Sequence, residues 1–239
     1  MTSNPSPRYV QAVAQAFRTG QYGPDMRYSG RYGDLGATVA AILLDREARA
    51  DTLDSDKTAG MLREPVLRVI HFMRSLGFSS KEGREVELSS LFERIGQAHT
   101  FSPSVFSFFP PDYSPAGVVA DARLTSPEAV LLTAPLMFSM INGLSSLARA
   151  GLTTCYEGFG SRVAGTSRGC GTEVSAKASS DGNVTFMPLS ADADAAISEL
   201  DLLLTGGRLN SNTKAVIRSA YLSKLAQSPA AAISVCRAS

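Results

Sequence analysis

Residues 62–77, LREPVLRVIHFMRSLG, give the clearest fold signal in this sequence. After Pro65 the apolar side chains recur at intervals of three and four residues, which is the period of one face of an α-helix. A proline near the start and a glycine just past the end, here Gly77, are typical of helix boundaries. Because the residue before a proline is driven out of the helical region, we expect the preceding turn either to stop near Arg63 or to kink there. The apolar positions of this helix are Val66, Val69, Ile70, Met73 and Leu76.

Similar patterns predict that most of the chain is helical. A helix capped by Ser6 should end at Gly20, and a helix capped by Asp34 should run to about residue 50. Pro135 should kink or split the longest helix, because an internal proline removes a backbone hydrogen bond. Further helices are expected over residues 85–97, 126–150, 192–206 and 211–225. The inward-facing side chains of the helix that starts at Asp34 are predicted to be Leu35, Val39, Ile42 and Leu43.

We therefore predict an all-α fold, an irregular multi-helix bundle. Its unusual part is the Phe/Pro segment, residues 101–117, FSPSVFSFFPPDYSPAG. The prolines exclude a regular helix or a central strand. Its aromatic side chains are large apolar groups that favour burial. We expect an ordered, buried, irregular segment that lies against the helices.

The predicted domain organisation follows changes in composition and hydrophobic periodicity along the chain. We expect a helical region over residues 1–150, which includes the Phe/Pro segment, a Gly/Ser-rich loop insert over 151–190, and C-terminal helices of the same domain over 191–239. In the insert, residues 172–178 alternate weakly and residues 184–187 resemble a strand. That pattern predicts a small β-hairpin on a mobile loop.

Composition excludes several classes of function. The chain has 239 residues, a formal net charge of +1, 44% hydrophobic residues and 19% charged residues. Scattered basic residues and a near-zero net charge argue against a nucleic-acid partner. With only 2 histidines and 3 cysteines, the chain is not predicted to hold a metal. No Walker-type lysine loop is present, and the glycine motifs do not lie between a strand and a helix, so no cofactor is expected.

The sequence contains neither a secretory signal at its start nor a predicted membrane span. The most apolar window, residues 129–147, is interrupted by Pro135 and Asn142, which is typical of a buried helix. The cysteines leave two alternatives open. Either all three are free thiols, or Cys155 and Cys170 form a disulfide and Cys236 is left over.

Four residues are weak candidates for catalysis, and each has a structural alternative. Arg63 and Glu64 could form a buried ion pair beside Pro65, which is more often a device that fixes packing than a site. His71 follows two apolar residues and could be a hydrogen-bonded core histidine. Asp112 in PPDY could close an Asx-type turn. Asp45 and its charged neighbours, by contrast, are predicted to be a solvated helix end with local ion pairs.

Several stretches together are similar to one known family. The sequence resembles family eighteen-hundred of the domains of unknown function, which occurs in bacteria and algae. The stretches that carry the resemblance are GDLGATVAAILLDREARA (33–50), LREPVLRVIHFMRSLG (62–77), SPSVFSFFPPDYSPAG (102–117), LTSPEAVLL (124–132) and LDLLLTGGRL (200–209).

The resemblance implies more about setting than about chemistry. Members of this family are usually longer, and this chain resembles their C-terminal half, without the Trp- and His-containing helix segment of the N-terminal half. Bacterial members often carry an export signal and are encoded beside a sulfatase-like partner family. The resemblance therefore implies an exported or cell-surface parent protein, and it supplies no reaction and no catalytic residues.

Two functions follow from these observations. The first is a non-catalytic structural or binding module of an exported or cell-surface protein, which would dock a protein partner or the missing N-terminal half through an exposed apolar face. The second is a fragment of a hydrolase-like enzyme whose site the missing half completes, with Arg63, Glu64, His71 and Asp112 as the contributors from this chain. The absence of a convincing catalytic set favours the first.

Overall fold

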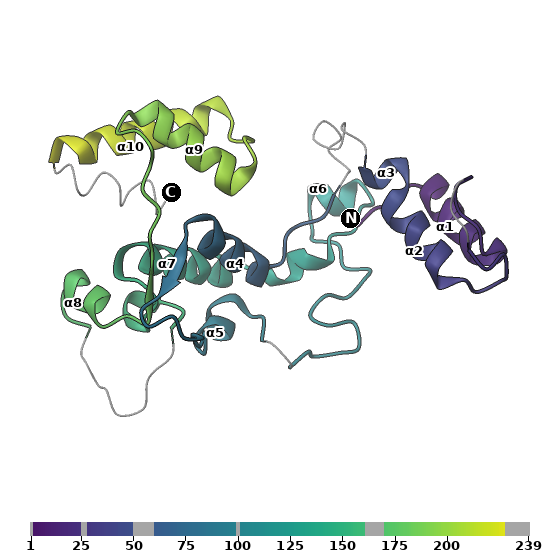
Figure 1. Ribbon diagram of the computed structural model, residues 1–239, viewed down its shortest axis with the longest axis horizontal. Helices are drawn as coiled ribbons and strands as arrows, with labels where there is room; N and C mark the ends of the chain where they lie inside the picture. The colour runs from purple at the N-terminus through teal and green to yellow at the C-terminus, as the bar shows by residue number, and fades with distance from the viewer. Residues whose placement is uncertain (1, 25–27, 50–59, 99–100, 161–169, 228–239) are drawn as a thin grey trace. The chain divides into compact units, whose positions relative to one another are not determined.

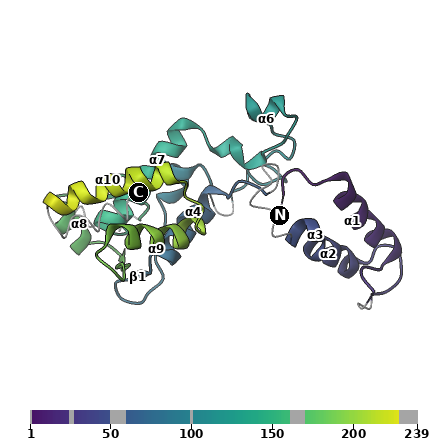
Figure 2. The ribbon, with the colours of Figure 1, turned by 90° about the horizontal axis from the view of Figure 1, so that it is seen from above.

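The computed structural model describes residues 2–24, 28–49, 60–98, 101–160 and 170–227. Over these residues the protein is mostly helical, with one two-stranded antiparallel sheet (Figures 1 and 2), which confirms the predicted fold class. The elements are α1 (Pro7–Thr19), α2 (Leu35–Leu44), α3 (Arg46–Arg49), α4 (Pro65–Ser75), β1 (Phe78–Ser80), α5 (Leu91–Ile95), α6 (Val118–Asp121), the 3-10 turn η2 (Pro127–Leu131), α7 (Ala134–Ala150), the 3-10 turn η3 (Cys155–Glu157), α8 (Glu173–Ala178), β2 (Gly182–Val184), α9 (Ala193–Thr205) and α10 (Ser211–Gln227).

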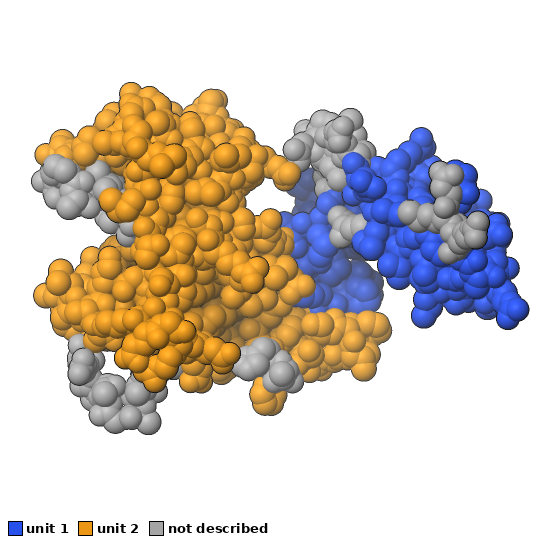
Figure 3. All heavy atoms as spheres, in the orientation of Figure 1, with its two compact units in different colours: residues 1–62, 109–130 blue, residues 63–108, 131–239 orange. Residues whose placement is uncertain are grey.

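The chain forms two compact units, which Figure 3 distinguishes by colour. Unit 1 comprises residues 1–62 and 109–130, and unit 2 comprises residues 63–108 and 131–239. The Phe/Pro segment therefore contributes to both units.

Unit 1 is built on a helical hairpin. The side chain of Ser6 accepts a hydrogen bond from the amide of Tyr9 and so caps α1, which Pro7 opens as predicted. Gly20 ends α1 in the left-handed conformation, with φ of 61°. A β-carbon at Gly20 would lie 2.3 Å from the carbonyl oxygen of Arg31, so glycine allows the returning chain to touch the end of α1. The chain then enters α2, which lies beside α1 in both ribbon views (Figures 1 and 2).

Unit 2 has a conventional apolar core, to which α4, α5, α7, α9 and α10 contribute. α4 begins at Pro65 and ends just before Gly77, and its buried side chains fall on the predicted face. Gly143 lets α7 approach the following chain, because a β-carbon there would lie 2.2 Å from the ring of Phe159. The buried members of the core are Val69, Met73, Leu76, Leu91, Ile95, Met140, Leu147, Leu152, Phe159, Val184, Ala193, Leu200 and Tyr221.

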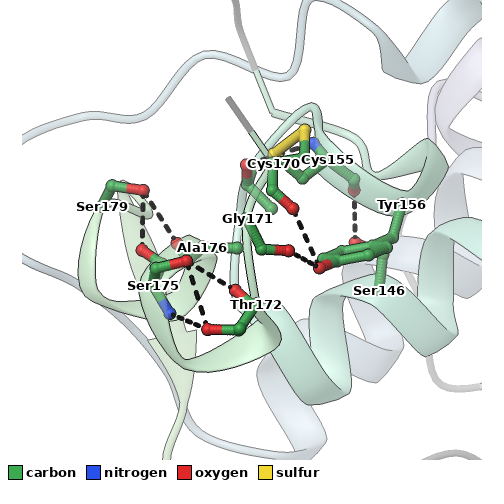
Figure 4. Close-up of a disulfide and its surroundings, with 10 residues drawn as sticks. Ser146, Cys155, Tyr156, Cys170, Gly171, Thr172, Ser175, Ala176 and Ser179 are labelled. Atoms are coloured by element: carbon green, nitrogen blue, oxygen red, sulfur yellow. Dashed lines mark hydrogen bonds between the residues drawn. A yellow bond between two sulfur atoms is a disulfide. The ribbon is translucent and has the colours of Figure 1, made fainter. Parts of the chain in front are cut away.

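The disulfide alternative for the cysteines is correct. Cys155 and Cys170 are bonded, with 5.3 Å between their Cα atoms (Figure 4). The hydroxyl of Tyr156 donates to the carbonyl oxygens of Cys170, at 3.0 Å, and Gly171, at 2.6 Å. The hydroxyl of Ser146 on α7 donates to the carbonyl oxygen of Cys155 at 2.8 Å. The segment before the disulfide is thereby fastened to α7.

The predicted hairpin within the 151–190 insert is wrong. Residues 173–178 form α8, whose first turn is capped by Thr172, and β2 pairs instead with β1, with Phe78 opposite Val184. Residues 161–169 lie outside the described residues. The described remainder of the insert is packed rather than loose, since Leu152, Cys155, Phe159, Ala176 and Val184 are buried.

Three helix predictions also need correction. The helix expected from Asp34 to residue 50 breaks at Asp45, whose backbone is extended because its side chain is held by other elements. The helix expected over 85–97 shrinks to α5. The helix expected over 126–150 is split into η2 and α7. Pro135, which was predicted to kink or split this helix, lies in the first turn of α7, where a proline is tolerated.

The Phe/Pro segment is irregular, as predicted, but its burial was predicted wrongly. Phe101, Val105 and Phe106 are exposed, and Val105 is 96% exposed. A local bridge between Ser104 and Ser107 turns the chain, so Val105 and Phe106 extend outward from a tight bend.

Candidate functional site: an apolar groove on unit 1

An apolar groove of about 640 Å³ lies along the helical hairpin of unit 1. The α1 side contributes consecutive positions of one helical face, and the α2 side contributes Thr38 and Ile42. Among the described residues of its lining, Arg18 is the one with a charged side chain. The lining residues are Thr2, Pro5, Tyr9, Val10, Val13, Ala14, Phe17, Arg18, Tyr32, Thr38 and Ile42.

Small side chains at the helix–helix contact create this surface. The fully buried residues between α1 and α2 are Ala16, Ala37 and Ala41. Alanines let two helices approach closely, but they bury little apolar area themselves. Of the larger side chains of α1, Tyr9 is buried and its hydroxyl donates to the carbonyl oxygen of Ile42, whereas Val10 in the groove wall is 52% exposed.

A stripe of large apolar residues on α2 continues the surface outward. Leu35, Val39 and Leu43 are spaced by four residues and are 69%, 50% and 52% exposed. At about 100° per residue, this stripe adjoins the face of α2 that carries Thr38 and Ile42. The prediction that the stripe faces inward is wrong, because α2 is apolar nearly all round and its alanines, not its large residues, form the contact.

The N-terminal end of α1 is fastened by an ion-paired cluster. The guanidinium of Arg8 donates to both carboxylate oxygens of Asp45, at 2.5 and 3.1 Å, and Asp45 is buried. Glu47 accepts from the amide of Ser6 at 2.8 Å and from its hydroxyl. Hydrogen bonds from Arg8 lower the pKa of Asp45, and those from Ser6 lower the pKa of Glu47. Both acids therefore stay ionised and occupied by partners within the unit.

The opposite end of the groove has no such compensation. Arg18 and Arg31 are exposed, and within the described chain neither side chain has a hydrogen-bond or ion-pair partner. The nearby acid, Asp34, caps α2: it accepts from the amides of Ala37 at 2.9 Å and Ser29 at 2.6 Å. A hydrogen bond from the side chain of Ser29, together with these backbone bonds, lowers the pKa of Asp34 to about 2. Among the described residues, Arg18 is therefore a cation of the groove lining that no acid pairs.

The four predicted catalytic residues do not assemble a site in the described structure. Glu64 accepts a hydrogen bond from the side-chain amide of Gln97 at 2.6 Å. The side-chain oxygen of Gln97 in turn accepts from the backbone amide of Val66 at 3.1 Å, so the two residues satisfy a backbone amide in the first turn of α4. His71 Nε2 lies 3.3 Å from the carbonyl oxygen of Leu204.

The other two predicted residues are exposed. Among the described residues, the side chain of Arg63 forms no ion pair with Glu64. The carbonyl oxygen of Arg63 accepts a hydrogen bond from the guanidinium of Arg68. Asp112 belongs to unit 1 and lies in a turn that the amide of Tyr113 closes onto the carbonyl oxygen of Pro110. Glu64 and His71 thus have separate structural partners, and Asp112 has a turn role.

Over the described residues, no group of three or more His, Cys, Asp or Glu side chains is arranged to hold a metal ion. No described helix is long and apolar enough to cross a membrane. The groove of unit 1 therefore offers apolar contact, with Arg18 as a positive charge in its described lining.

A family model described as "Protein of unknown function (DUF1800)" matches residues 1–236. The chain belongs to this family. No curated protein and no solved structure matches it. The stretches that resemble DUF1800 in sequence include the start of α4, where Glu64 and Gln97 meet, and the end of α9.

At the end of α9, the DUF1800 stretch LDLLLTGGRL contains a buried acid that the sequence patterns missed. Asp201 accepts from Lys214 Nζ at 2.7 Å, from the amide of Leu209 at 3.0 Å and from the hydroxyl of Thr205. These bonds lower its pKa to about 2. The signal was an acid inside an apolar helical run, which is an expensive place for a charge unless it is paired. Here it fixes the turn between α9 and α10.

Proposed function

We propose that this DUF1800 chain is a non-catalytic binding module of an exported or cell-surface protein, and that the apolar groove of unit 1 is where it docks a protein partner. The observation that carries the proposal is the groove with its adjoining stripe on α2. Soluble monomers seldom expose contiguous large apolar side chains of this kind, and where they do, the patch is usually an interaction site.

The disulfide supports the exported setting. Disulfides persist in oxidising compartments and are rare where thiols are kept reduced. The bond between Cys155 and Cys170 therefore fits a protein that folds outside the cytosol. No arrangement of described residues gives the hydrolase alternative comparable support, because Glu64 and His71 are each occupied by partners of their own.

The docking part can be tested by crosslinking in the native cell envelope. A photoreactive amino acid replaces Val10, which lines the groove, and in a matched control replaces Gln11, which is exposed on the same helix outside the groove. We expect a discrete crosslinked adduct from position 10 and none from position 11. Equal adducts from both positions, or none from either, would show that the groove is not a docking surface.

The exported part has a separate test. Thiols of intact cells are blocked with a maleimide, the protein is denatured and reduced, and newly exposed thiols are labelled with a second maleimide. We expect Cys155 and Cys170 to carry the second label, because they are bonded to each other in the cell. The first label on both residues would contradict an oxidising location.

A further inference from the structure

We infer that the groove of unit 1 takes an amphipathic segment of a partner protein with an apolar face and a carboxylate placed to meet Arg18. This inference rests on the proposed docking function and adds the chemistry of the partner. It is argued from three observations: the shape of the surface, the distribution of its charge and the spacing of its apolar side chains.

The shape favours a segment with protruding side chains. The groove runs between two helices and holds about 640 Å³, which is enough for several apolar side chains. Peptide segments that bind such grooves do so as amphipathic helices, with anchors on one face at i, i+3, i+4 and i+7. The stripe formed by Leu35, Val39 and Leu43 extends the apolar contact beyond the groove wall.

The positive charge at the groove favours a partner segment that carries negative charge. Every described acid of the α1–α3 region already has partners: Asp45 binds Arg8, Glu47 binds Ser6, and Asp34 caps α2. Arg18 and Arg31 remain without described partners, and the backbone of Arg31 lies against Gly20, two residues beyond Arg18. Arg18 lies in the groove lining, so an incoming carboxylate would form an ion pair with its guanidinium there.

The apolar lining beside Arg18 indicates how apolar and acidic residues should be arranged in the partner segment. Tyr32 lies edge-on to Phe17, with 5.0 Å between the ring centroids, and forms a wall beside Arg18. An apolar partner residue fits that wall, and an acidic neighbour of it would meet Arg18. An apolar face flanked by acid is thus the pattern that matches this surface, and a basic flank would be repelled.

An anionic lipid surface has part of the same chemistry, since arginines near exposed apolar side chains also attract membranes. The composition of α2 favours the protein partner. No charged residue occurs within α2 itself, whereas helices that lie on membranes are typically rich in basic residues along their polar face.

The test uses the full chain and a library of 14-residue peptides whose apolar positions follow helical spacing, with Glu and Lys equally available at the flanking positions. We expect selected peptides to be enriched in Glu and to lose binding about tenfold to Arg18→Glu. The same variant should instead select peptides enriched in Lys. Arg74→Glu is the control, because Arg74 is likewise exposed in the last turn of a helix, α4 of unit 2.

Each other outcome overturns the inference. Peptides without a charge preference, or a preference that Arg18→Glu leaves unchanged, would show that Arg18 does not select the partner. Binding to vesicles of phosphatidylglycerol and phosphatidylcholine, lost in Arg18→Glu, without charge-selective peptides would assign the surface to lipid. If crosslinking from position 10 succeeds while the library shows no charge preference, the docking function stands and this inference alone fails.

Discussion

The two units stabilise themselves with different kinds of side chain. Unit 2 buries large residues, such as Leu147, Phe159 and Tyr221, in one continuous cluster. The helical hairpin of unit 1 buries alanines together with Tyr9 and is fastened at its end by the Arg8–Asp45 pair. The difference shows that an apolar helix need not place its largest residues inside. Where small residues form the contact, the large ones are left on the surface and become available to a partner.

The largest loss of stability should come from removing a large side chain from the core of unit 2. Phe159→Ala removes a fully buried ring that fills the space left by Gly143 on α7, and we expect it to lower the free energy of unfolding by about 3–5 kcal/mol. Urea denaturation followed by circular dichroism measures the change. A loss below about 1 kcal/mol would mean that the core of unit 2 is less well packed than its burial indicates.

A smaller, localised effect should follow when the polar fastening of unit 1 is removed. Asp45→Ala deletes the carboxylate that binds Arg8 and caps α3 through the amide of Glu47, and we expect a loss of about 1–3 kcal/mol. Hydrogen exchange should show lost protection in α1 and α2 and unchanged protection in α4 and α7. Uniform loss across both units would contradict the division of the chain into separately stabilised parts.

The smallest effect should come from the exposed stripe. Val39→Ser changes a side chain that is half exposed and outside the alanine contact, so the free energy of unfolding should change by less than about 0.5 kcal/mol. Ala41→Ser, on the buried face of the same helix, is the matched comparison and should cost more. If Val39→Ser destabilises as much as Ala41→Ser, the stripe is part of the core and not a surface for a partner.

Much of the fold was predictable because helix ends carry local signals. α1 and α9 begin and end within a residue of the predicted positions, since Ser6 and Asp192 cap them and Gly20 and Gly206 end them. Burial was predictable on α4, where one face is apolar and the other polar. It was not predictable on α2, because a helix that is apolar all round gives no periodicity from which to choose its inner face.

Local sequence patterns could not predict the candidate site. The groove exists only because α1 and α2 pair, and the bond from Arg8 to Asp45 joins residues 37 positions apart. Asp45 looked like part of a solvated helix end, because its neighbours Arg46 and Glu47 offered local partners. The exposed aromatics of the Phe/Pro segment were misjudged for a related reason, since burial follows from what surrounds a side chain and not from its size alone.

The disulfide has a consequence for how this chain can be altered. Cys155 and Cys170 close a covalent ring between the end of α7 and the start of α8, and both anchors are held by hydrogen bonds from Ser146 and Tyr156. Residues inserted between Cys155 and Cys170 would enlarge the ring, but the disulfide would still join α7 and α8 by the same short connection. Doubling a loop costs only about 0.6 kcal/mol of closure entropy. An epitope or a reporter inserted into the ring would therefore leave the connection between α7 and α8 closed by the disulfide.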